Sequence, residues 1–253
     1  DDVSDARRVV VAVREDAVLK SMGGRMEGLD RRIRIAVSDV VEYSPVTREH
    51  IGGEGMSLRM DELERLVTVT RSELSASGRR LPILLGLSGA STAKLLDALD
   101  ETAAWPIDGY LIASPYYVRP SQCGLLQHFT ALADHASWPL VLYNIPYRCA
   151  VGIDNDTLLQ LAEHPNIVGM KDCCANRDQT IDLLRRRPAG FRVLTGEDAE
   201  YHNALVDGAD GAILLSAHVE TAAFAAVRTL LWEGNQEGAE AQWREVGGLT
   251  RLL

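Results

Sequence analysis

The chain has few lysines, few cysteines and no long apolar run. Of its 26 basic residues in 253, only Lys20, Lys94 and Lys171 are lysines. No apolar run approaches the roughly 18 residues of a membrane-spanning helix, and the charged start DDVSDARR is unlike a signal peptide. The formal net charge of -10 argues against a basic face for nucleic acid. We therefore expect neither a membrane nor a nucleic-acid partner.

Sites built from cysteine or histidine are also scarce. The four cysteines contain no C-x-x-C pair, although Cys173 and Cys174 are adjacent, and the six histidines show no H-E-x-x-H spacing. We expect no metal and no cofactor, and we expect reduced thiols in a cytoplasmic protein. The adjacent thiols are interpreted as core packing.

Short apolar runs and helix-like stretches alternate from residue 81 onward. Six runs are almost uniformly apolar, as parallel strands covered on both faces are. These runs are LPILLGL (81–87), GYLIASP (109–115), PLVLYNIP (139–146), NIVGMKD (166–172), FRVLTGED (191–198) and GAILLSA (211–217). The stretches at 91–104, 155–164 and 176–187 are predicted as helices between them.

This alternation predicts an α/β fold. No G-x-G-x-x-G follows a strand, which disfavours a dinucleotide-binding sheet and favours a (β/α)8 TIM barrel. The two further strands that a barrel needs are expected at 7–14 and 32–43. We expect a single barrel domain over residues 1–253, in which residues 1–50 fit the pattern less well.

The predicted strands end in polar, reactive side chains, and a barrel gathers such ends at one face. Lys171 follows the run NIVGM, and Tyr143 ends the run before it. Burial disfavours the charged form of an amine, and a neutral amine forms a Schiff base with a ketone. A tyrosine hydroxyl can then move protons, and an arginine can clamp a substrate carboxylate. A lysine at a strand end also often reaches solvent or pairs with a carboxylate such as Asp172, so both interpretations stay open at this point.

Longer motifs around these residues favour the Schiff-base interpretation. They are PYYVRPSQCGLLQHF (115–129), LYNIPYR (142–148), IVGMKD (167–172), LTGED (194–198) and GAILLSA (211–217). In sequence and spacing they resemble the dihydrodipicolinate synthase / N-acetylneuraminate lyase family of class I Schiff-base aldolase barrels. The resemblance extends over residues 53–253. It implies a lyase that acts on pyruvate and a small aldehyde, in a homo-oligomer that is a dimer or a tetramer.

The resemblance also implies roles for individual residues. Lys171 would form the iminium with pyruvate, Tyr143 would relay protons above it, and Tyr117 would complete the relay from a neighbouring subunit. Arg148 matches the synthase branch, where it would hold the carboxylate of aspartate semialdehyde. The alternatives are an aldolase of 2-keto-3-deoxy acids or of the sialic-acid type, or a catalytically impaired barrel that binds a keto acid.

The resemblance is incomplete near the start and the end of the chain. It implies that Gly53, Gly196 and Ile213 bind substrate, yet Ile51 and Gly52 stand where the family has the two threonines of G-T-T-G-E. The part of the chain before these positions does not resemble the family's first strand and helix. The helical extension after the barrel is expected to be truncated.

Overall fold

A computed structural model of the chain describes residues 58–76, 78, 81–174 and 176–251. Its contacts divide the chain into two compact units, one with residues up to 85, 105–108 and 214 onward, the other with residues 86–104 and 109–213. The strands expected at 7–14 and 32–43 lie outside the described residues. In the part that is described, no helix is long and apolar enough to cross a membrane.

Six strands form one sheet in the order of the sequence. They are β1 (Leu84–Leu87), β2 (Gly109–Ala113), β3 (Leu140–Asn144), β4 (Ile167–Asp172), β5 (Arg192–Thr195) and β6 (Gly211–Ala212). From β2 to β6, each strand pairs in parallel with the next. Leu140 and Leu142 on one face of β3 and Val141 on the other are all buried, so this strand is covered on both faces, as the uniformly apolar runs predict.

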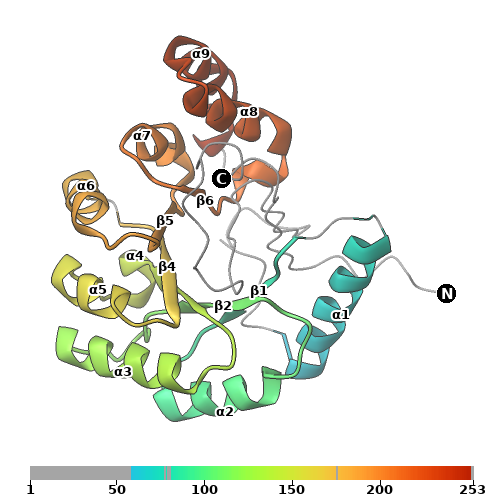
Figure 1. The fold of residues 1–253 in the computed structure, drawn as a ribbon, viewed down its shortest axis with the longest axis vertical. Helices are drawn as coiled ribbons and strands as arrows, with labels where there is room; N and C mark the ends of the chain where they lie inside the picture. Colours follow the sequence, from blue (N-terminus) through green and yellow to red (C-terminus); the bar gives the residue numbers. More distant parts are fainter. Residues whose placement is uncertain (1–57, 77, 79–80, 175, 252–253) are drawn as a thin grey trace. The chain divides into compact units, whose positions relative to one another are not determined.

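The longer helices of the second unit lie on one side of β2 to β5 (Figure 1). They are α2 (Thr92–Thr102), α3 (Gln122–His135), α5 (Asn155–Ala162), α6 (Arg177–Arg186) and α7 (Tyr201–Val206). The short α4 (Pro146–Cys149) and the 3-10 turn η2 (Asp198–Glu200) follow the ends of β3 and β5. Ser91, Ser121 and Asn176 cap α2, α3 and α6 by accepting a backbone N–H of the first turn. The three helices expected from the sequence are thus confirmed as α2, α5 and α6.

The last predicted strand is wrong in its length. GAILLSA was expected to be extended over 211–217, but β6 ends at Ala212, and Ser216–His218 form the 3-10 turn η3. Its partner β5 ends at Thr195, whose carbonyl accepts the Ile213 N–H as the final bond. Past Ala212 the chain remains buried at Ile213 and Leu214, each 2% exposed, before it turns into η3.

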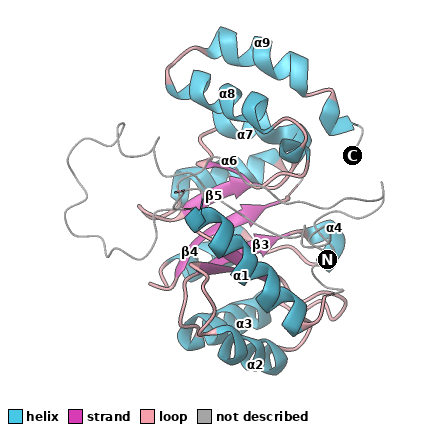
Figure 2. Cartoon of the chain, turned by 90° about the vertical axis from the view of Figure 1, so that its right-hand side faces the viewer, coloured by secondary structure: helices cyan, strands magenta, loops and turns pink. Residues whose placement is uncertain are grey.

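The first unit contributes α1 (Met60–Ala76), η3, α8 (Thr221–Trp232), α9 (Gln236–Val246) and η4 (Leu249–Arg251). The helices α8 and α9 lie side by side (Figures 1 and 2), and the rings of Phe224 and Trp243 meet edge to face with centroids 5.9 Å apart. In the same unit, Arg71 of α1 donates to the Pro106 carbonyl and forms an ion pair with Asp108. These bonds join α1 to the segment that precedes β2.

Candidate active site

Lys171 and Tyr143 lie side by side at the ends of neighbouring strands. They are register partners of the parallel pair β3–β4, so their side chains leave the sheet on the same face. Lys171 is buried, with 7% of its surface exposed, and its Nζ lies 4.3 Å from the centroid of the Tyr143 ring. The structure thus brings together the predicted nucleophile and the predicted proton relay.

Gly196 makes room for the stem of Lys171. Its N–H donates to the Asp172 carbonyl at 2.7 Å, which holds its backbone against the end of β4. A Cβ at this position would lie 2.5 Å from Lys171 Cε and 2.4 Å from Cys173 Sγ, closer than real contacts allow. Only glycine therefore fits here while Lys171 keeps its place, whatever contact with substrate the residue also makes.

Cys173 adjoins Tyr143, and the charge of Glu197 influences Cys173, although neither residue was predicted as a site residue. Cys173 is 1% exposed, and its thiol donates to the Tyr143 hydroxyl with Sγ and Oη 3.9 Å apart. Burial raises the pKa of this thiol to about 12, opposed by the charge of Lys171 and reinforced by Glu197. The charge of Glu197 also contributes to raising the pKa of the Tyr147 phenol, for which burial is the main cause.

The sequence held a signal for only one of these two residues. Glu197 belongs to the predicted run FRVLTGED and lies two residues after the end of β5, where polar strand ends gather. Cys173 belongs to a buried cluster with Ala113, Ile145 and Cys149, as its interpretation as core packing implies. Its position beside the hydroxyl of Tyr143 depends on the conformation of the turn after β4, and the sequence alone does not specify that conformation.

The other predicted site residues are not gathered around Lys171 in the same way. Tyr117, in the loop after β2, is 89% exposed and has a left-handed backbone with φ of 71°. Arg148 is exposed on α4, with its guanidinium carbon 5.8 Å from the Tyr147 ring centroid. Neither side chain hydrogen-bonds to Lys171 within the described chain. Ile213 is buried just past β6, and Gly53, like Ile51 and Gly52, lies outside the described residues.

Comparison with known proteins decides the family. Residues 29–252 match the profile of the dihydrodipicolinate synthetase family, which is most of the chain. The chain belongs to this family. The resemblance that the motifs showed is therefore confirmed, and the matched span begins before Gly53.

Relatives within the dihydrodipicolinate synthetase family resemble the chain in sequence and in fold. It is 40% identical over 173 residues to 4-hydroxy-tetrahydrodipicolinate synthase 2 of Clostridium acetobutylicum, covering 68% of this chain and 60% of the relative. The structure of 4-hydroxy-tetrahydrodipicolinate synthase from Methylacidiphilum fumariolicum SolV matches with a TM-score of 0.74 and 35% identity, over 79% of this chain and 66% of that one. The chloride-inhibited dihydrodipicolinate synthase from Acinetobacter baumannii, solved with pyruvate, matches with a TM-score of 0.72 and 30% identity, over 79% and 67%.

These likenesses confirm the predicted fold class, a (β/α)8 barrel. The described residues supply six of its parallel strands and the helices between them. The chain spans 60% of the length of the Clostridium relative.

In this family member, Asp172 turns to the face of β4 opposite to Lys171. Its carboxylate accepts hydrogen bonds from Asn144 Nδ2 at 2.9 Å, Thr180 Oγ1 at 2.9 Å and the Cys174 N–H at 3.0 Å. Burial raises the pKa of Asp172, and these hydrogen bonds oppose the rise. No ion pair joins Asp172 to Lys171 among the described residues, so the interpretation of the lysine as a partner of that carboxylate is wrong.

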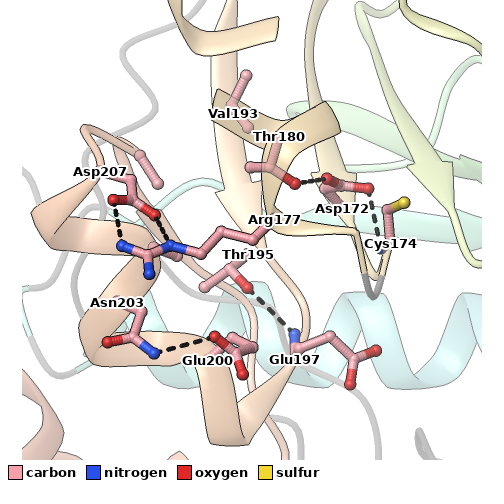
Figure 3. A pocket seen from close by; sticks show the side chains of 12 residues that line it. Asp172, Cys174, Arg177, Thr180, Val193, Thr195, Glu197, Glu200, Asn203 and Asp207 are labelled. Atoms are coloured by element: carbon pink, nitrogen blue, oxygen red, sulfur yellow. Dashed lines mark hydrogen bonds and ion pairs between the residues drawn. The ribbon is translucent and has the colours of Figure 1, made fainter. Parts of the chain in front are cut away.

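A cavity of about 270 Å³ lies on this outer face, lined by β4, β5, α6 and α7 (Figure 3). Arg177 of α6 and Asp207 at the end of α7 form a two-point ion pair in its wall, with both N–O distances 2.7 Å. Lys171 and Tyr143 do not line it. Over the described ranges, no group of three or more His, Cys, Asp and Glu side chains could hold a metal ion.

Proposed function

We propose that this chain is a 4-hydroxy-tetrahydrodipicolinate synthase, which condenses pyruvate with aspartate semialdehyde. The observation that carries the proposal is the buried Lys171 amine lying 4.3 Å from the ring centroid of Tyr143. Relatives that bear this name, and a related structure solved with pyruvate, support the same chemistry.

The first half of the reaction would take place at Lys171. Its amine, after losing its proton, would add to the ketone carbon of pyruvate, and the ketone oxygen would leave as water to give an iminium. Loss of a proton from the methyl carbon then gives an enamine, which attacks the aldehyde carbon of the second substrate. The aldehyde oxygen takes up a proton, and attack of the amino group of aspartate semialdehyde on the new iminium carbon would displace Nζ, close the product ring and regenerate the amine. Because only 7% of Lys171 is exposed, bulk water has little access to the intermediate.

Tyr143 would move the protons that these steps require. Addition, water loss and enamine formation each transfer a proton at an atom bonded to or next to Lys171 Nζ, and the Tyr143 ring lies against that nitrogen. A hydroxyl held at such a place can act as general acid and then as general base. Tyr117 would extend the relay, supplied by a second copy of the chain.

Arg148 would select the second substrate. It is exposed on α4, directly after the strand that carries Tyr143, and its guanidinium offers two parallel donors to a carboxylate. An acceptor aldehyde with a carboxylate would therefore be preferred. This preference separates the synthase from an aldolase of 2-keto-3-deoxy acids or sialic acids.

Borohydride reduction in the presence of pyruvate tests the proposal. We expect a covalent adduct on Lys171 in peptide mass mapping, no adduct in Lys171→Arg, and wild-type labelling in the control Lys94→Arg. Arg148→Ala should keep the adduct and lose turnover of aspartate semialdehyde, by about tenfold or more for one charge-assisted pair. Labelling of other lysines without Lys171 would rule out the mechanism. An unchanged turnover in Arg148→Ala would show that Arg148 does not hold the carboxylate, and a wild type without turnover of aspartate semialdehyde would favour the aldolase.

The chain would work as a homo-oligomer in the cytoplasm. A tyrosine that is 89% exposed beside the half-exposed Val118 suits a surface covered by a second copy. The four cysteines are free thiols, which is usual for a reducing compartment.

A further inference from the structure

Two side chains converge on the backbone of Gly196, and both also reach Tyr143. Cys173 Sγ and Lys171 Cε each lie within 2.5 Å of where a Cβ of Gly196 would stand. The sulfur is 3.9 Å from Tyr143 Oη, while Lys171 Nζ lies over the ring of the same tyrosine. The Cys173 thiol therefore contacts the hydroxyl of Tyr143, while the Lys171 amine lies over the face of the same ring.

The sulfur is held in this place by the backbone and by packing. The Cys173 N–H donates to the Asn144 carbonyl at 2.8 Å, which continues the pairing of β3 and β4 past the last residue of β4. Its side chain is 1% exposed in a small apolar cluster against which Tyr143 packs. A side chain fixed in this way loses little further entropy when it holds a neighbouring hydroxyl.

The thiol also lies within the electrostatic influence of a carboxylate. The charge of Glu197, which directly follows Gly196, adds to burial in raising the pKa of the Cys173 thiol to about 12. Cys173 therefore keeps its proton at neutral pH and acts as a donor rather than as a nucleophile.

We propose that Cys173 is a positioning residue for Tyr143: its thiol holds the phenol hydroxyl toward the atoms bound at Lys171. The catalytic consequence rests on the proposed function, whereas the contact between thiol and phenol does not. Serine should serve in the same role, because a hydroxyl donates at the same position, and alanine should not.

The contact can be measured without any substrate. In protein labelled with [13C]tyrosine, the NMR signal of Tyr143 is assigned by its loss in Tyr143→Phe and then titrated with pH. Cys173→Ala should raise its titration midpoint by about half a unit or more, because a donor to the phenolate is lost. Cys173→Ser should leave the midpoint at or below the wild-type value. The matched control is Cys149→Ala, which removes a buried thiol from the same cluster but one that donates to the Ser114 carbonyl, and it should leave the midpoint unchanged.

Steady-state kinetics supplies the second readout. Cys173→Ala should lower kcat about tenfold with little change in KM for pyruvate, as expected for a weakened general acid-base group, and Cys173→Ser should restore most of it. If Cys173→Ala leaves the titration midpoint of Tyr143 unchanged, this inference is overturned, whatever the effect on turnover. Should Cys173→Ala not fold, a midpoint raised above wild type in Cys173→Ser overturns it instead. A wild type that forms no pyruvate adduct on Lys171 overturns the proposed function and leaves the midpoint result standing.

Discussion

At the scale of one residue, the position of the Lys171 amine depends on the absence of a side chain at Gly196. Its backbone lies so close to β4 that an added methyl group would occupy the space of the Lys171 stem and the Cys173 sulfur. A side chain at this position would push the nucleophile away from Tyr143. The close packing of Lys171 against Gly196 is thus possible because glycine has no Cβ.

Gly196→Ala should slow the formation of the pyruvate adduct about 10- to 100-fold, because a shift of about 1 Å in a reacting group costs rate on this scale. The measurement is the rate at which borohydride-trapped Lys171 peptide accumulates. Gly86→Ala is the matched control, since no atom lies within 4 Å of its added Cβ. Equal adduct rates in the two variants would contradict the steric account.

At the scale of elements, the packing of α3 against α2 depends on a neutral histidine. His128 of α3 is 6% exposed, and its Nδ1 lies 2.8 Å from Oγ1 of Thr92, the first residue of α2. Its Nε2 is buried with no hydrogen-bond partner in the described part of the chain. Burial therefore lowers the pKa of His128 from 6.5 to about 4.

We expect the free energy of unfolding to decrease as the pH falls from about 6.5 to about 4. Over this window the unfolded chain binds a proton at His128 and the folded chain does not, which costs up to about 3 kcal/mol. Urea denaturation at several pH values measures the loss. His128→Gln should remove most of the pH dependence, whereas His135→Gln, at an exposed position of the same helix, should leave it in place. A wild-type stability that stays constant across the window would show the expectation to be wrong.

At the scale of the whole molecule, a relay that needs Tyr117 from a second copy would divide each site between two chains. Its exposed ring and left-handed backbone hold it away from its own core. Two inactive variants could then complement each other in a mixed oligomer, because each supplies the residue that the other lacks.

Tyr117→Phe and Lys171→Arg should each lose most activity, and a mixture that is allowed to exchange subunits should recover about a quarter of the wild-type rate. In a twofold dimer half of the pairs are mixed, and each mixed pair contains one complete site. Sedimentation of each variant checks that assembly is intact. No recovery from two assembled variants would place Tyr117 outside the shared site.

The neighbourhood of Lys171 and Tyr143 was predictable, because the ends of consecutive parallel strands meet at one edge. The shortness of β6 was not, because an apolar run does not reveal where the partner strand stops. Cys173 was predicted to be buried, but its contact with Tyr143 follows from the turn after β4. The positions that carry the strands expected at 7–14 and 32–43 are not described, so those strands stay predictions.

The sequential order of the sheet has a consequence for synthesis on the ribosome. Each strand from β2 to β6 pairs with its immediate predecessor in the chain, so every newly made strand finds its partner already extruded. At the usual rate of roughly 5–20 residues per second, β4 can dock on β3 within seconds of leaving the exit tunnel. Lys171 would then lie on an unpaired edge strand until β5 and Gly196 have been synthesised and pack against β4.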